Sequence, residues 1–338
     1  MTSNFQFNFE GFSPKVPEVN ENILYDFLII GGGPAGLNAA LYAKRKGLET
    51  GIITKQIGGQ IVNTSTVENY LGTTTATGEE LVTNFKNHVL ELDVPISEYT
   101  EVEEIIPGIS YHEVVLTDGR VIKGRSLLLA TGTNHRKIGV PGEDRLAGRG
   151  VAYCAICDAP LYKNKNVIIA GGGNSAVEAA LDLTKVANHV TLVHRSQFRA
   201  DQILVDELYQ NDKVDIHLET QILSIEGDDF FSHIHVFDKE KNQEFDLSAD
   251  GVFIEIGVVP NSDLFVDLVE MNEFGEVIVD EKGQTNISGI FAAGDVTTVG
   301  YKQIVIASSD GAKTALAAND YINLLNANER TSNYENVK

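Results

Sequence analysis

Cysteine is nearly absent from this sequence. Only two cysteines, Cys154 and Cys157, occur among 338 residues. A disulfide framework that stabilises a small secreted fold needs several pairs, and closing so short a loop adds little stability. A structural zinc site is the alternative, but no second cysteine pair or closely spaced histidine group would complete its four ligands, so no metal site is predicted. The pair is therefore interpreted as redox-active.

Basic residues are also scarce. There are 26 Lys and Arg against 48 Asp and Glu, which gives a formal net charge of −22. An acidic protein repels nucleic-acid phosphates and anionic lipid headgroups. Neither nucleic acid nor a membrane is therefore expected as a partner.

Long hydrophobic runs are missing as well. A membrane-spanning helix needs about 20 apolar residues, whereas the longest runs, such as residues 27–30, have the length of a strand. The first residues show no basic start followed by an apolar stretch, so nothing indicates a secretory signal. We expect a cytoplasmic protein. In the same segment Phe5, Phe7 and Phe9 alternate with polar residues, which suits a docking arm or edge strand as well as a frayed tail.

One pattern does occur twice. Residues 26–40 and residues 166–180 each contain a short aliphatic run, a G-x-G-x-x-G or G-x-G-x-x-A turn and an Ala-rich stretch. Each copy predicts the strand, turn and helix that begin a dinucleotide-binding unit. The glycines allow the turn and the close approach of a pyrophosphate, which the helix N-terminus faces. The candidate binding residues are Gly31, Gly33, Pro34, Ala35 and Gly36 in the first copy, and Gly171, Gly173, Asn174, Ser175 and Ala176 in the second.

Each half of the chain also contains a β-rich stretch. Asp118-Gly119 is a strong hairpin signal, and a hairpin-like patch spans residues 230–247. The tail ends in a strand, a Gly-Asp pair and an Ala-rich helix that we expect to finish near Leu325. We predict an α/β fold of two Rossmann-like, doubly wound, three-layer nucleotide-binding domains with β-meander insertions, the second domain inserted in the first.

Several further motifs occur in the order of one enzyme family. The set is Gly31-x-Gly33-x-x-Gly36, Gly58-Gly59-Gln60, Glu68-Asn69-Tyr70, Ala130-Thr131-Gly132, Cys154-Ala-Ile-Cys157-Asp158, Gly171-x-Gly173-x-x-Ala176, His194-Arg195 with Phe198-Arg199-Ala200, and Gly294-Asp295. Over about residues 24 to 325 the chain resembles the low-molecular-weight bacterial thioredoxin reductases and the flavoprotein subunit of alkyl hydroperoxide reductase. This resemblance implies an FAD-dependent NAD(P)H:protein-disulfide oxidoreductase that forms a homodimer.

The resemblance also implies how the chain is divided. An N-terminal arm (1–22) would precede an FAD-binding domain made of residues 23–137 and 263–338, and residues 138–262 would form the NAD(P)H-binding domain with the redox cysteine pair. Two linkers, near residues 134–140 and near 260–261, would join the domains. Such a paired connection makes a good hinge.

For the flavin, the resemblance implies that Asp295 bonds the ribityl chain and that Gln60 and Asn69 lie near the isoalloxazine. A turn at residues 301–303 would place a helix N-terminus at the N1/O2 edge, where reduced flavin is anionic. Asp295 also suits a helix cap, and Gln60 and Asn69 also suit ordinary turns. The other cofactor-binding candidates of this domain are Thr131, Gly132, Gly294, Lys302, Gln303 and Ile304.

The cysteine pair can form a reversible disulfide whose nucleophile is a thiolate. Asp158 is the candidate proton donor and acceptor, although Asp in a turn before Pro is often structural. The resemblance implies electron flow from NADPH to FAD, to Cys154–Cys157 and then to thioredoxin or a glutaredoxin-like protein. Both the nicotinamide and the cysteine pair must reach one flavin ring, so the inserted domain would rotate between half-reactions.

The choice of nicotinamide rests on the end of the second Rossmann strand. An acidic residue there binds the ribose 2′-OH of NAD, whereas arginines accept the 2′-phosphate of NADP. This chain has His194, Arg195 and Arg199 and no carboxylate at the strand end. NADPH is therefore predicted. Family members that use NADPH have a loop one residue longer with one more arginine, so NADH is kept as a second candidate, and two solvated surface arginines are the plainer alternative.

Two rival functions stay open. The tail from Gly294 also resembles that of an alkyl hydroperoxide reductase flavoprotein, which would serve a peroxiredoxin. Against this, the extra N-terminal redox domain is not seen in this sequence, and Cys-Ala-Ile-Cys is nearer to the thioredoxin reductase form. A flavin redox sensor or binding module without turnover is the rival of another class, but it has no need of a cysteine pair beside Asp158.

Overall fold

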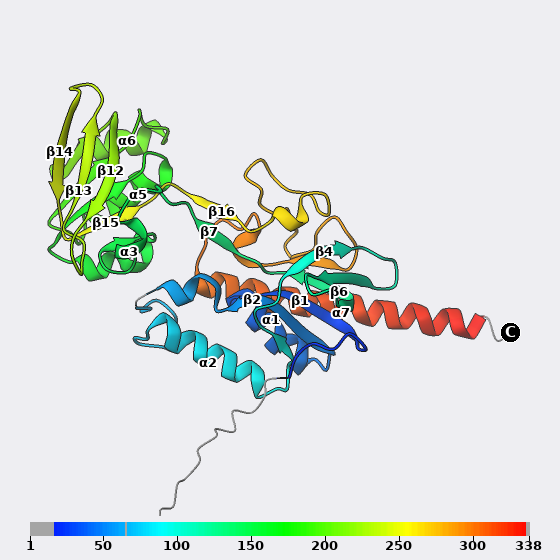
Figure 1. Ribbon diagram of the computed structural model, residues 1–338. Helices are drawn as coiled ribbons and strands as arrows, with labels where there is room; N and C mark the ends of the chain where they lie inside the picture. Colours follow the sequence, from blue (N-terminus) through cyan, green and yellow to red (C-terminus); the bar gives the residue numbers. More distant parts are fainter. Residues whose placement is uncertain (1–16, 65, 336–338) are drawn as a thin grey trace, which may run out of the picture.

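The computed structural model describes residues 17–64 and 66–335. These residues form two α/β lobes of unequal size, joined by a narrow connection (Figure 1). The alternating phenylalanines of the predicted arm, at positions 5, 7 and 9, lie outside the described residues. Within residues 17–64 and 66–335, no helix combines the length and the apolarity needed to cross a membrane.

The larger lobe is built on a seven-stranded sheet with the order β3-β2-β1-β6-β5-β4, and β17 pairs with β6. The first three strands, β6 and β17 are parallel, and β4, β5 and β6 form an antiparallel meander. Because β17 belongs to this sheet, the C-terminal segment returns to the lobe in which the chain began. The strands are β1 (Leu24–Gly32), β2 (Thr50–Ile57), β3 (Ile96–Ser97), β4 (Val102–Ile106), β5 (His112–Leu116), β6 (Val121–Leu129) and β17 (Ile290–Ala292).

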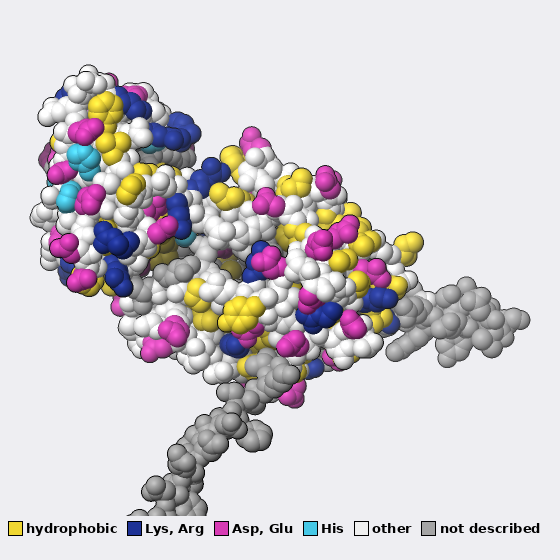
Figure 2. All heavy atoms as spheres, in the orientation of Figure 1, with side chains coloured by type: hydrophobic (Ala, Val, Ile, Leu, Met, Phe, Trp, Pro, Cys, Tyr) yellow, Lys and Arg dark blue, Asp and Glu magenta, His cyan; other side chains and the backbone are white. Residues whose placement is uncertain are grey.

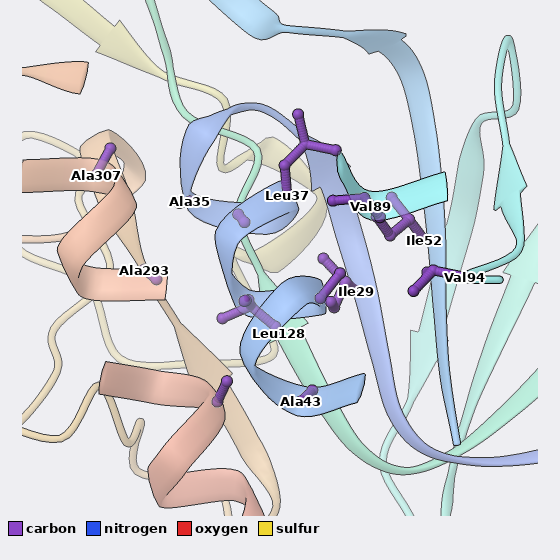
Figure 3. Close-up of a cluster of buried hydrophobic side chains, with 14 of the residues drawn as sticks. Ile29, Ala35, Leu37, Ala43, Ile52, Val89, Val94, Leu128, Ala293 and Ala307 are labelled. Carbon is purple, nitrogen blue, oxygen red and sulfur yellow. The ribbon is translucent and has the colours of Figure 1, made fainter. Parts of the chain in front are cut away.

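Helices cover one face of this sheet, namely α1 (Pro34–Arg45), α2 (Gly78–Leu90) and α7 (Ile304–Glu335). Ile29 of β1, Ile52 of β2 and Leu128 of β6 point into the core that these helices close (Figure 3). The next residues along β1, Leu28 and Ile30, belong to a second core on the opposite face. Alternation along one strand thus supplies two cores, as a three-layer fold requires.

The smaller lobe has a five-stranded parallel sheet with the order β11-β10-β9-β15-β8. The helices α5 (Asn174–Leu183) and α6 (Gln202–Tyr209) belong to the core of one face, and an antiparallel meander contributes to the core of the other. The sheet strands are β8 (Val151–Ala152), β9 (Asn166–Ala170), β10 (His189–Val193), β11 (Val214–His217) and β15 (Gly251–Ile254). The meander strands are β12 (Thr220–Glu226), β13 (His233–Asp238) and β14 (Gln243–Ser248).

Two antiparallel strands, β7 (Thr133–His135) and β16 (Val258–Pro260), connect the lobes (Figure 1). Asn134 and Asn261 also exchange a side-chain hydrogen bond of 2.7 Å beside this pair. On the face shown in Figure 2, acidic, basic and apolar side chains are interspersed over both lobes. The connection consists of two chain segments and a few polar contacts, as a hinge requires.

The predicted fold class is confirmed, with two Rossmann-like sheets, a β-meander in each lobe and the hairpin turn at Asp118-Gly119. The numbered domain boundaries at 137 and 262 stay predictions. The expected end of the last helix near Leu325 was wrong, because α7 continues to Glu335. No glycine or proline follows Gly311 in this helix, so the sequence contains no residue that would end it earlier.

Candidate active site

The first glycine loop joins β1 to α1. Gly31 has φ +119°, and a Cβ there would lie 2.2 Å from the Ala130 carbonyl oxygen. At Gly36 a Cβ would lie 2.0 Å from the Gly31 carbonyl oxygen, whereas Gly33 has open space around it. Gly33 is the N-cap of α1 and supplies no side-chain cap, with Pro34 at the start of the helix. The first backbone N–H groups of α1 are therefore left for a ligand anion.

Thr54, at the end of β2, is buried and its hydroxyl accepts a hydrogen bond of 3.0 Å from the Gly32 N–H. Many FAD sites have an acidic residue in this region for the adenosine ribose. Here the threonine instead satisfies a donor of the glycine loop itself. The loop is held in place without a charged group.

The structure brings several predicted flavin contacts to the carboxyl ends of β1, β6 and β17. Gln60, in a short helix (Gly59–Asn63), donates from Nε2 to the Thr133 carbonyl oxygen and hydroxyl, at 2.7 and 2.8 Å. Asn69 and Gln303, 234 residues apart, are joined by a bond of 3.3 Å. Thr131 donates from its hydroxyl to the Asn261 carbonyl oxygen at 2.7 Å. Gly132 follows at the start of the connection to the smaller lobe.

Asp295 lies in a short helix (Gly294–Val296) directly after β17. Its Oδ1 is buried and has no hydrogen-bond partner among the described residues. Burial raises the pKa of this carboxyl to about 6, and Lys302 opposes the shift. An unpaired buried acceptor is costly unless a ligand supplies a donor.

Lys302 itself is held away from free solution. Its Nζ donates to the Thr297 carbonyl oxygen at 2.6 Å and forms an ion pair with Glu276 at 3.0 Å. Gln303 follows, and Ile304 is the first residue of α7. The residues of this lobe fit FAD, because they combine a glycine cradle at a helix N-terminus with the unpaired acceptor of Asp295.

The second glycine loop joins β9 to α5. Gly171 has φ +158°, and a Cβ there would lie 2.2 Å from the Glu255 carbonyl oxygen. Gly173 has open space and is the N-cap of α5, again without a side-chain cap. Asn174 exchanges two hydrogen bonds with Asp201, of 3.0 and 2.8 Å. In the first turn of α5, Ser175 is exposed and Ala176 is buried.

The loop after β10 packs directly on this glycine loop. The His194 ring is so close to Gly172 that a Cβ there would lie 2.3 Å from it, and the Arg199 N–H donates to the Gly172 carbonyl oxygen at 2.8 Å. Burial lowers the pKa of His194, and the positive charges of Arg199 and Arg195 lower it further. Both arginines are exposed. The predicted nucleotide-binding residues of this lobe therefore form one cluster.

Cys154 and Cys157 form a disulfide at the start of α4 (Ala155–Asp158), with their Cα atoms 5.3 Å apart. Cys154 is the N-cap of this short helix, and its sulfur accepts a bond of 3.3 Å from the Cys157 N–H. Between them, Ile156 is 66% exposed. The pair is therefore oxidised and borders the protein surface, where a partner can reach it.

Asp158 follows the pair directly. Its Oδ1 is buried without a hydrogen-bond partner among the described residues, and burial raises the pKa of this carboxyl to about 6. Its charge also contributes to the raised pKa of Tyr162, which burial alone shifts most. A carboxyl poised near neutral pH beside a disulfide is suited to moving protons.

Two further acidic residues near the pair did not stand out in the sequence. Glu255, just after β15, is largely buried, and its Oε1 accepts a bond of 3.0 Å from the Ala155 N–H, while burial raises its pKa to about 7. Glu143 is 2% exposed and accepts bonds from Ile138 N, Gly139 N and the Tyr153 hydroxyl. A charged residue inside the apolar run of residues 251–257 was the available signal for Glu255. Among the described residues, no three His, Cys, Asp or Glu side chains group as metal ligands would.

Comparison with known proteins places these features in a family. The family model for pyridine nucleotide-disulphide oxidoreductases matches residues 25–311. The F component of alkyl hydroperoxide reductase in Escherichia coli is 42% identical over 310 residues, which cover 90% of this chain and 60% of the relative. The chain therefore spans about 60% of the length of this curated relative.

Among solved structures, thioredoxin reductase from Streptococcus pyogenes matches with a TM-score of 0.85 and 38% identity, covering 89% of this chain and 99% of that one. The Lactococcus lactis thioredoxin reductase in its FR conformation gives a TM-score of 0.62 at 35% identity, covering 88% and 99%. The chain therefore belongs to the pyridine nucleotide-disulphide oxidoreductase family, as a flavoprotein oxidoreductase of the thioredoxin reductase type with a redox-active disulfide.

Proposed function

We propose that this protein carries electrons from NADPH through FAD to Cys154–Cys157, and from there to the disulfide of thioredoxin or a glutaredoxin-like protein. The observation that carries the proposal is the oxidised cysteine pair at the surface of the nucleotide-binding lobe, directly followed by the buried carboxyl of Asp158. The match along 99% of a solved thioredoxin reductase supports the same conclusion.

FAD would be held in the larger lobe by the glycine loop at Gly31 and Gly33 and by Asp295. When bound, it accepts a hydride from the nicotinamide and passes two electrons to the disulfide. The unpaired Asp295 oxygen would accept a hydrogen bond from a ribityl hydroxyl. The N-terminus of α7, at Ile304, would favour negative charge at its end of the ring, because a helix is positive there.

The protein's own part in the chemistry is the movement of protons and the exchange of disulfides. Two electrons and one proton convert Cys154–Cys157 into one thiolate and one thiol. The thiolate then attacks the partner's disulfide, the second cysteine resolves the mixed disulfide, and the partner leaves as a dithiol. Asp158 would supply and take up the proton at the sulfurs, since its pKa of about 6 allows both states near neutral pH.

Rotation of the smaller lobe about β7 and β16 would bring first the nicotinamide and then the disulfide to the flavin. The two-stranded connection supports this proposal. A second support is the pair of structural matches, 0.85 against 0.62 in TM-score at nearly equal identity and coverage. A difference in the relative orientation of two otherwise similar lobes produces such a gap.

NADPH is proposed as the donor because Arg195 and Arg199 lie beside the second glycine loop. The identity to the alkyl hydroperoxide reductase relative favours a second candidate function, reduction of a peroxiredoxin system. The homodimer stays a prediction.

Steady-state oxidation of NADPH and of NADH tests the function directly. The flavin-loaded protein would be assayed with thioredoxin disulfide, a glutaredoxin-like protein, and a two-cysteine peroxiredoxin with hydroperoxide. We expect sustained NADPH oxidation with thioredoxin or the glutaredoxin-like protein, and none in Cys157→Ser. Turnover with the peroxiredoxin alone would favour the second candidate. A single reduction of the flavin with no turnover in any arm would instead indicate a redox sensor.

A further inference from the structure

We propose that Lys239, on the meander of the smaller lobe, is a third cation of the site for the nucleotide 2′-phosphate and determines specificity for it. The inference rests on the proposed use of NADPH and names a residue that lies 44 positions beyond Arg195. The loop after β10 has one arginine fewer than the family pattern described above. Lys239 supplies the missing positive charge from a different part of the chain.

The geometry ties Lys239 to that loop. Lys239 follows β13, and its N–H donates to the Glu219 carbonyl oxygen at 3.0 Å, which anchors its backbone beside the end of β11. From there the side chain reaches the Arg195 carbonyl oxygen, to which its Nζ donates at 2.5 Å. The ammonium group is therefore held at the backbone of the residue that is expected to bind the phosphate.

The charges around His194 describe the same cluster. Arg199, Arg195 and Lys239 each lower the pKa of His194, although burial lowers it most. Within the described ranges, neither arginine side chain forms an ion pair, and both are exposed. Three positive charges thus gather at the end of β10, where a Rossmann unit places the adenosine ribose.

Lys239 retains donors for a ligand. An ammonium group carries three N–H donors in all, and one of them is used by the Arg195 carbonyl oxygen. A dianionic phosphate would take a remaining donor together with the two guanidinium groups. A 2′-hydroxyl needs no such charge.

Glu219 opposes this site and explains why the preference for a 2′-phosphate is incomplete. Its Oε2 lies 3.9 Å from Lys239 Nζ, and its Oε1 accepts a bond of 3.1 Å from Gln197 Nε2. The carboxylate therefore faces the same loop as the cations. It repels a phosphate and partly neutralises Lys239, which leaves room for NADH.

Equilibrium binding of two adenosine nucleotides tests the role without enzyme turnover. The flavin-loaded, oxidised protein would be titrated calorimetrically with 2′,5′-ADP and with 5′-AMP, which differ by the 2′-phosphate alone. Lys239→Gln should weaken 2′,5′-ADP about tenfold and leave 5′-AMP unchanged, since one charge-assisted hydrogen bond is lost. Glu219→Gln should tighten 2′,5′-ADP by a few-fold, because a nearby like charge is removed.

Lys241→Gln is the matched control. Lys241 lies in the same turn but forms its ion pair with Asp238, at 2.8 Å. This variant should change neither titration by more than about twofold, since an exposed charge away from the ligand contributes little. An equal loss in both lysine variants, or an equal loss of 5′-AMP and 2′,5′-ADP in Lys239→Gln, would overturn the role of Lys239.

The two levels of the proposal fail in different ways. If wild type binds 5′-AMP as tightly as 2′,5′-ADP, the use of NADPH is itself wrong. If wild type prefers 2′,5′-ADP and Lys239→Gln keeps that preference, only the assignment of Lys239 is wrong.

Discussion

Replacement of Glu255 by glutamine should change how the stability of the protein depends on pH. Burial raises the pKa of Glu255 from its ordinary value of 4.5 to about 7. The folded chain therefore keeps a proton that the unfolded chain releases, and the stability gained from it is complete below pH 4.5 and lost as pH rises to about 7. A shift of about 2.5 pKa units corresponds to about 3 kcal/mol.

The variant removes this loss, and its amide oxygen can still accept the bond from the Ala155 N–H. Relative to wild type, Glu255→Gln should gain about 2–3 kcal/mol more at pH 8 than at pH 5, because part of the effect is already present at pH 5. Differential scanning calorimetry of the oxidised protein at both pH values measures this. The chain has no tryptophan, and a two-lobed protein need not unfold in one step, so calorimetry is preferred to fluorescence.

Glu240→Gln, at an exposed position in the turn between β13 and β14, is the control and should change both pH values equally. Asp158 and Asp295 also have raised pKa values, but they are present in wild type and variant alike and cancel in the comparison. The same pH dependence in Glu255→Gln and wild type would refute the physical reasoning.

Three other changes have clear expected outcomes. Asp158→Asn should leave flavin bleaching by NADPH intact but slow reduction of the partner disulfide by about 10²-fold or more, with no response of the rate near pH 6; stopped-flow absorbance measures both steps. Gly36→Ala should destabilise the larger lobe by about 1–3 kcal/mol through overlap with the Gly31 carbonyl, whereas Gly33→Ala should fold normally and retain less flavin, as thermal unfolding and visible absorbance would show. Asp295→Asn should raise the flavin dissociation constant about tenfold, in a titration with FAD, by removing a charged acceptor.

Local signals in the sequence predicted much of this molecule. The repeated glycine patterns predict strand, turn and helix because each glycine meets a steric demand that the structure also shows, such as the 2.2 Å approach at Gly31. The cysteine pair and Asp158 are adjacent in the chain, so their proximity followed from the sequence alone. The return of the tail to the first sheet followed from a short apolar run before Gly294.

Contacts between distant segments could not be predicted in the same way. Lys239 lies in a run of charged residues that is typical of a solvated turn, and its approach to Arg195 depends on how the meander packs on the parallel sheet. Likewise Glu255 reaches Ala155 only because β15 and α4 meet in the folded lobe. The length of α7 was underestimated because tertiary packing, rather than a local stop signal, sets where such a helix ends.

Anaerobic reduction of wild type and Cys157→Ser compares the two halves of the electron path in one measurement. NADPH should bleach the flavin in both proteins, and subsequent addition of thioredoxin disulfide should yield free thiols on the partner only with wild type. Continued reduction of the partner by Cys157→Ser would contradict passage of electrons through the Cys154–Cys157 pair.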